Sequence, residues 1–226
     1  MASQCHFVSH DKTVPAEVYT PRGGSKAGAI VVGYGSDGLT DNLNGPWASM
    51  IRDHSASLAK AGFIVVVPDY LCVTGTEPGM TAIAAIGAHR ASWQAVISDA
   101  VDFATTLRLV DASRIGLLGY SLGAHLCLRI RSRAKVLVEF FGPLFDGIGP
   151  SGAISRVQIH HGQSDNVVPF DQNAEPIKQQ LEREGTHTEL FAYSGASHGF
   201  GRADQADSAA LAESKDRAVK CFLASL

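Results

Sequence analysis

Short runs of β-branched and other apolar residues recur along the chain, and amphipathic stretches separate them. Four such runs read as strands buried on both faces of a parallel sheet and lie at 29–32, 64–67, 115–118 and 136–138. Helix formers with apolar residues three and four positions apart occupy 47–61, 92–107, 122–131, 172–184 and 208–223. This alternation of strand and helix predicts a doubly wound α/β sheet.

Four shorter segments extend the predicted sheet. Residues 157–160 and 188–192 supply two late strands, and residues 5–8 and 16–19 are expected to form an antiparallel edge. The total is about eight strands, mostly parallel, with helices on both faces. Because no repeat, low-complexity tract or linker interrupts the pattern, we expect one domain over 1–226.

The longest stretch without a clear pattern is 71–91, which we interpret as irregular. A lid or the wall of an acyl pocket could form there. The chain is too short to carry a larger cap, so the expected fold has no large cap domain.

Composition and charge narrow the class of partner. The 226 residues are 45% hydrophobic, and 19 Lys and Arg oppose 22 Asp and Glu without any block of like charge. This balance leaves no basic patch that would bind nucleic acid or an acidic membrane, so we expect a small-molecule partner. No apolar run reaches the roughly 18 residues of a membrane span, and the first residues lack the pattern of a signal peptide, which predicts a cytoplasmic protein.

The four cysteines, Cys5, Cys72, Cys127 and Cys221, lie far apart and form no Cys-x-x-Cys pair. This spacing argues against a zinc or redox centre and is typical of reduced thiols. We therefore expect neither a metal nor a cofactor. The sequence leaves the oligomeric state open.

A serine motif carries the candidate chemistry. Gly-x-Ser-x-Gly occurs at 119–123, directly after the strand at 115–118 and before the helix at 122–131. This position would present Ser121 at the carboxyl edge of the sheet, above a helix amino terminus. A second match at 195–199 does not run directly into a helix, and we interpret it as unrelated to catalysis.

A serine nucleophile needs a base and an acid, and in this topology both follow it along the chain. Asp165 comes after the strand at 157–160, and His198 comes after the strand at 188–192. We predict a triad of Ser121, His198 and Asp165. Asp146, just past the strand at 136–138, stays open as an alternative acid.

Two backbone N–H groups are required for the developing oxyanion. The residue after the nucleophile, Leu122, supplies one, and we assign the other to Ser36 in the glycine-rich loop 33–38. Tyr34 in that loop and Tyr120 beside the nucleophile are predicted to contact substrate. The alternative for this loop is a flexible connection between strand and helix.

At these residues the chain resembles an α/β-hydrolase of the dienelactone hydrolase family, over most of its length. The shared motifs are the loop 33–38, Val-Pro-Asp at 67–69, the serine motif at 119–123, and the segments around Asp165 and His198. The resemblance implies an α/β-hydrolase fold. Typical members of the family carry a cysteine nucleophile and a glutamate in the oxyanion loop, where this chain has Ser121 and Gly35.

The resemblance also implies a role for Arg202, four residues after His198. At this spacing the family places an arginine that holds the substrate carboxylate, which would favour an anionic ester or lactone. The alternative is a solvated charge near Asp204 and Asp207.

Ser121 and Gly35, which stand where typical family members have cysteine and glutamate, favour a serine esterase over dienelactone chemistry. We therefore predict a cofactor-free serine hydrolase that cleaves small carboxylic esters or lactones through an acyl-enzyme. An acyl thioester hydrolase is the alternative that uses the same groups. A ligand-binding protein on a hydrolase scaffold is the alternative from another class, because fold alone does not fix function.

Overall fold

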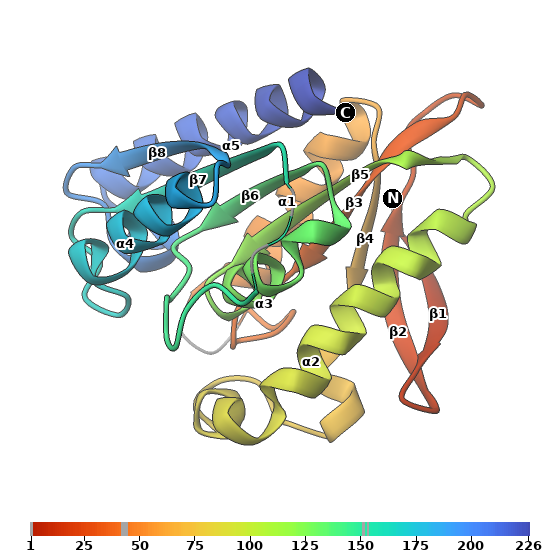
Figure 1. The fold of residues 1–226 in the computed structure, drawn as a ribbon, viewed down its shortest axis with the longest axis horizontal. Coiled ribbons are helices and arrows are strands. Elements are labelled where there is room, and N and C mark those ends of the chain that lie inside the picture. Colours follow the sequence, from red (N-terminus) through yellow and green to blue (C-terminus); the bar gives the residue numbers. More distant parts are fainter. Residues whose placement is uncertain (1, 42–44, 151, 153) are drawn as a thin grey trace.

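The computed structural model describes residues 2–41, 45–150, 152 and 154–226. In this part of the chain eight strands form one sheet with the order β1-β2-β4-β3-β5-β6-β7-β8 (Figure 1). The strands are β1 (Ser3–Ser9), β2 (Lys12–Tyr19), β3 (Ala27–Gly33), β4 (Ile64–Pro68), β5 (Val110–Tyr120), β6 (Val136–Phe140), β7 (Arg156–Gly162) and β8 (His187–Tyr193). The α-helices are α1 (Trp47–Lys60), α2 (Met80–Thr106), α3 (Leu122–Arg129), α4 (Phe170–Arg183) and α5 (Gln205–Ser225).

The sheet is mostly parallel, as predicted. Strand β3 pairs in parallel with β4 and β5, and parallel pairing continues through β6, β7 and β8. Strand β2 pairs antiparallel with β4, and β1 pairs antiparallel with β2, which confirms the antiparallel edge. His10 and Asp11 join β1 to β2 with φ angles of 50° and 57°, as a tight hairpin turn requires.

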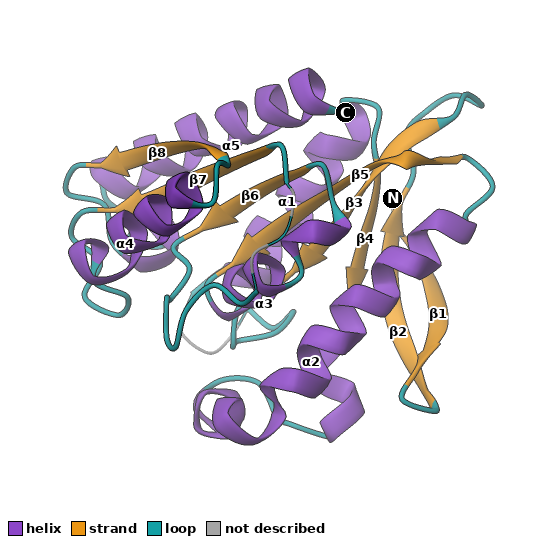
Figure 2. Ribbon diagram, viewed as in Figure 1, coloured by secondary structure: helices purple, strands orange, loops and turns teal. Residues whose placement is uncertain are grey.

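Helices cover both faces of the sheet, and their apolar sides enclose the core between them and the strands. Figure 2 shows α2, α3 and α4 on one face and α1 and α5 on the other. Every residue of β3, β4 and β6 is buried. Strands covered on both sides need continuous apolar sequence, which explains why these runs were the clearest signal in the chain.

The interpretation of 71–91 as irregular is wrong for much of that segment. A short 3-10 helix occupies Tyr70–Thr74, and α2 begins at Met80 and continues without interruption to Thr106. Glycine and proline at 75–79 mask the helix start, where Gly79 has φ 90°. The following alanine-rich turns have high helix propensity, although the exposed Ile83 obscures the amphipathic pattern.

Because the strands from β3 to β8 run in parallel, the loops at their carboxyl ends gather at one edge of the sheet. The segments after β3, β5, β6, β7 and β8 all contribute to one cleft there. Within the described residues no helix is both long and apolar enough to cross a bilayer.

Candidate active site

Ser121 occupies a strained turn between β5 and α3. Its φ and ψ are 49° and −119°, which is a conformation that non-glycine residues rarely adopt. The Ser121 N–H donates to the Phe140 carbonyl oxygen at 2.9 Å, so the neighbouring strand β6 anchors the turn. The turn lifts the serine side chain above the end of the sheet.

The two glycines of the serine motif are required by close backbone contacts. A Cβ at Gly119 would lie 2.4 Å from Cα of Ala124, and a Cβ at Gly123 would lie 2.2 Å from the Gly33 carbonyl carbon. Side chains cannot occupy such spaces. Close packing of the backbone therefore explains glycine at both positions.

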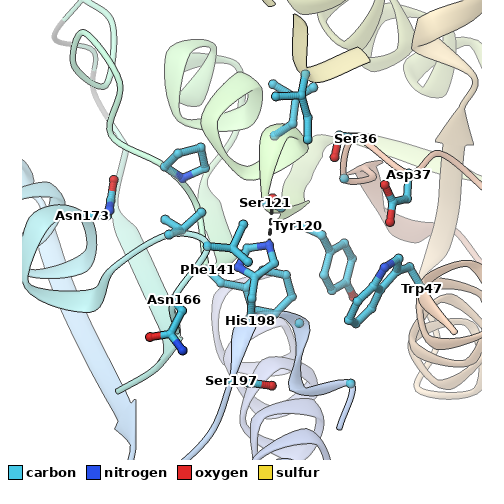
Figure 3. A pocket seen from close by; sticks show the side chains of 18 of the residues that line it. Ser36, Asp37, Trp47, Tyr120, Ser121, Phe141, Asn166, Asn173, Ser197 and His198 are labelled. Atoms are coloured by element: carbon cyan, nitrogen blue, oxygen red, sulfur yellow. Dashed lines mark hydrogen bonds between the residues drawn. The ribbon is translucent and has the colours of Figure 1, made fainter. Parts of the chain in front are cut away.

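The structure brings Ser121, His198 and Asp165 together, although 77 and 33 residues separate them along the chain. Nε2 of His198 lies 3.2 Å from Oγ of Ser121, and Nδ1 of His198 lies 2.7 Å from Oδ2 of Asp165. Figure 3 shows the imidazole directed at the serine oxygen. The arrangement is that of a nucleophile, a base and an acid in hydrogen-bond contact.

The Asp165 carboxylate is buried and held by several donors. The N–H groups of Val167 and Val168 donate to Oδ1 at 2.9 Å and 2.7 Å. Burial alone would raise the pKa of Asp165, but hydrogen bonds from His161 and His198 outweigh it and hold that pKa well below its usual range. At neutral pH the ionised Asp165 therefore accepts the Nδ1 proton of His198, which leaves Nε2 free to accept a proton from Ser121.

Asp146, the alternative acid, makes other contacts. Its carboxylate pairs with Arg90 at 2.6 Å and with Arg129 at 3.5 Å, and 57% of its side chain is exposed. The hydrogen bond of His198 is to Asp165 instead. The geometry favours Asp165 for the acid role.

The predicted oxyanion donors flank the serine. Ser36 and Leu122 both line the pocket that contains Ser121. A Cβ at Gly35 would lie 3.4 Å from Cβ of Ser121, so the loop after β3 adjoins the nucleophile. The Gly79 N–H donates to the Ser36 carbonyl oxygen at 2.9 Å, which ties this loop to the start of α2.

The predicted substrate contacts of Tyr34 and Tyr120 are not supported by their side chains, which are both 1% exposed. The Tyr34 hydroxyl donates to Asp69 at 2.6 Å, and its ring stacks on Tyr70, because the loop after β3 packs into the core. Tyr120 lines the pocket, but its hydroxyl is hydrogen-bonded to Nδ1 of His54 at 2.6 Å. Both tyrosines support the walls of the site.

Arg202 lines the pocket, but its guanidinium is engaged by the protein. Its Nε lies 3.1 Å from Asp204, one terminal nitrogen lies 3.3 Å from Asp207, and the same nitrogen donates to the Gly195 carbonyl oxygen. These partners favour the alternative reading of Arg202 as a charge balanced by nearby aspartates.

Asp207 is a residue that the sequence reasoning missed. It is fully buried in the first turn of α5 and accepts hydrogen bonds from the N–H and the hydroxyl of Ser197 at 2.7 Å and 2.5 Å, and from the Arg202 N–H at 2.7 Å. It thereby fixes both ends of the loop that carries His198. It also engages the serine of the second Gly-x-Ser-x-Gly match. The available signal was Asp204, three residues earlier, which caps α5.

A buried polar pair lies behind the acid. Nε2 of His161 lies 2.8 Å from the Val168 carbonyl oxygen and 3.3 Å from Oδ2 of Asp165. Glu139 on β6 is fully buried, and burial raises its pKa to about 7, although the charge of His161 and the Gly142 N–H oppose the shift. A raised pKa means that this buried carboxyl is more easily kept in its uncharged form.

The pocket around Ser121 has a volume of about 930 Å³. Trp47, Phe141 and His198 line this pocket together with the serine (Figure 3). The ring of Phe141 meets His198 edge-on, with ring centroids 4.9 Å apart. Among the described residues there is no group of three or more His, Cys, Asp or Glu side chains placed to hold a metal ion.

The dienelactone hydrolase family model matches residues 14–226. The chain belongs to the dienelactone hydrolase family. The hydrolase family and the α/β-hydrolase fold implied by the sequence motifs are therefore confirmed. No curated protein matches the chain significantly.

Solved structures share this fold at low sequence identity. A dienelactone hydrolase-like promiscuous phosphotriesterase from metagenomic libraries is 18% identical with a TM-score of 0.79, over 100% of this chain and 98% of that one. Propionate-bound esterase 2 from Thermogutta terrifontis is 18% identical with a TM-score of 0.74, over 99% and 94% of the two chains. The same esterase phosphorylated by paraoxon is 18% identical with a TM-score of 0.66, over 97% and 94%.

Proposed function

We propose that this hydrolase cleaves carboxylic esters, including lactones, of small molecules through a serine acyl-enzyme. The observation that carries the proposal is the hydrogen-bonded chain from Ser121 through His198 to Asp165 at the base of an open pocket. A serine nucleophile requires a base, and the contact between His198 and Ser121 supports His198 in that role.

In the proposed reaction, Nε2 of His198 takes the Ser121 proton while Oγ attacks the ester carbonyl carbon. The N–H groups of Ser36 and Leu122 stabilise the oxyanion. His198 then returns the proton to the departing alcohol, leaving an ester between Ser121 and the acyl group. Water activated by His198 cleaves this ester and restores the serine. Asp165 stabilises the imidazolium at both steps.

The similar structures support this proposal through the fold that they share with this chain at 18% identity. The esterase of that fold carries bound propionate in one structure and is phosphorylated by paraoxon in another. We expect this chain to react with paraoxon in the same way. An organophosphate should phosphorylate Ser121 and leave a stable adduct.

The test combines turnover with covalent labelling. Wild type, Ser121→Ala and Ser197→Ala are assayed with p-nitrophenyl butanoate, and each is incubated with paraoxon before intact-protein and peptide mass spectrometry. We expect Ser121→Ala to lose at least about 10⁴-fold in kcat and to escape labelling. Ser197→Ala, which alters the second motif, should still be labelled at Ser121.

Labelling at another residue, or full turnover by Ser121→Ala, contradicts the mechanism. The panel also includes a thioester substrate, because the same three side chains could cleave a thioester bond. Binding of esters without turnover or labelling would instead favour a ligand-binding protein on this scaffold.

A further inference from the structure

Exposed apolar side chains gather around the Ser121 pocket. Among the described residues, six large hydrophobic side chains are exposed, and four of them line this pocket, namely Met80, Ile83, Phe145 and Val167. The exposed fractions of Met80 and Val167 are 73% and 69%. A clustered, solvent-exposed apolar rim is costly unless something covers it, so it marks a binding surface.

The rim is assembled from three separate parts of the fold. Met80 and Ile83 project from the first turns of α2, Phe145 lies in the segment after β6, and Val167 lies in the segment after β7. Ile86, Leu144 and Val168 continue the apolar lining. Because independent segments converge on the same surface, the apolar character belongs to the pocket and not to one helix face.

The charged groups of the pocket disfavour an anionic substrate. Arg202 is the one lysine or arginine among the described residues that line the pocket, and Asp204, Asp207 and the Gly195 carbonyl oxygen surround its guanidinium. Asp37 adds a carboxylate to the same lining. A substrate carboxylate would meet an arginine whose charge Asp204 and Asp207 already offset, and it would be desolvated on the apolar rim at a cost that an uncharged chain avoids.

We propose that the substrates are uncharged esters whose acyl chain lies along the apolar rim formed by Met80, Ile83, Phe145 and Val167. This inference rests on the proposed function and specifies its substrate class. The pocket volume of about 930 Å³ is at the upper end of the range for small-molecule sites, so it accommodates acyl chains well beyond acetyl.

The first measurement is kcat/KM for p-nitrophenyl acetate, butanoate, hexanoate and octanoate, because these esters share one leaving group. Full burial of a methylene would raise kcat/KM about fourfold, and on this open rim we expect about twofold per methylene. A flat or falling series from acetate to hexanoate overturns the inference.

Val167→Ser tests the rim with a matched control. Val8 on the distant strand β1 is 69% exposed, the same fraction as Val167, so Val8→Ser removes an equally exposed valine outside the pocket. Val167→Ser should reduce the gain from butanoate to octanoate at least threefold, while Val8→Ser should follow wild type. Equal chain-length profiles for the two variants contradict the assignment of the rim.

Charge preference is measured with a pair of substrates of equal acyl length, p-nitrophenyl pentanoate and the p-nitrophenyl monoester of glutarate, which carries a terminal carboxylate. We expect kcat/KM at least tenfold higher for the uncharged ester. Equal rates, or preference for the anion, refute the inference while leaving the serine mechanism intact. If no ester is turned over and paraoxon does not label Ser121, the proposed function itself fails.

Discussion

Asp207 provides the sharpest test of how the fold positions His198. Its buried carboxylate accepts hydrogen bonds from the N–H groups of Ser197 and Arg202, which lie on either side of His198 in the chain. Replacement by alanine removes this acceptor and leaves the two amides to find other partners. We predict that Asp207→Ala lowers both stability and activity, although Asp207 does not contact Ser121.

The expected size follows from the hydrogen bonds that are lost. Each buried donor left without its acceptor costs about 1–3 kcal/mol. The two backbone bonds are counted in full. The Ser197 hydroxyl is left out because it can rotate toward another acceptor, and the ion pair with Arg202 adds little because half of the Arg202 side chain is exposed. The total is about 3 kcal/mol, which for a domain of this size lowers Tm by about 9 °C. A shift of about 1 Å in His198 would reduce kcat by about 100-fold.

Urea unfolding and ester kinetics at pH 7.5 measure the two effects, with Asp216→Ala as the control on the same helix. Asp216 is exposed and pairs with Lys220 at 2.6 Å, so its loss should cost less than about 0.5 kcal/mol. Asp207→Asn keeps one acceptor oxygen and should fall between wild type and Asp207→Ala. Equal unfolding midpoints for Asp207→Ala and Asp216→Ala would refute the reasoning.

Three further predictions concern the acid, a buried carboxyl and the backbone at the nucleophile. Asp165→Asn should lower kcat by about 10³- to 10⁴-fold, whereas Asp146→Asn should stay within about threefold of wild type, as steady-state kinetics will show. Burial raises the Glu139 pKa from 4.5 to about 7, so the folded state favours the protonated carboxyl. The free energy of unfolding should therefore decrease as the pH rises from 4.5 to about 7. Urea unfolding from pH 5 to 8 should therefore show wild type losing about 3 kcal/mol relative to Glu139→Gln, and parallel curves would contradict this. Gly123→Ala places a Cβ 2.2 Å from the Gly33 carbonyl carbon and should yield little folded protein by circular dichroism.

The parts of the fold that the sequence predicted are those specified by local pattern. Strands such as β3 and β6 are buried on both faces and therefore consist of continuous apolar residues. The glycine spacing around Ser121 reports backbone contacts within a single turn. The order of Ser121, Asp165 and His198 follows from the succession of strands, which a right-handed α/β topology constrains.

The parts that could not be predicted depend on contacts between distant residues. The start of α2 is obscured in the sequence because Met80 and Ile83 are exposed, line the pocket and break the amphipathic pattern. Tyr34 was expected to contact substrate, but the Asp69 acceptor 35 residues away directs its hydroxyl into the core. In the sequence Asp207 looks like an ordinary charge near a helix start. Only the structure shows that it accepts hydrogen bonds from the N–H groups of Ser197 and Arg202.

Gly35 connects the choice of nucleophile to the shape of the loop after β3. A Cβ at this position would lie 3.4 Å from Cβ of Ser121, an ordinary contact distance, so the fold leaves room for a Cβ there. Glycine at 35 is therefore not imposed by packing, in contrast to Gly123. A carboxylate at 35 would place a negative charge beside the developing oxyanion and oppose its stabilisation. In the proposed mechanism the Ser121 proton passes to His198, so no such group is needed, and glycine at 35 is consistent with a loop that offers its N–H groups to the substrate.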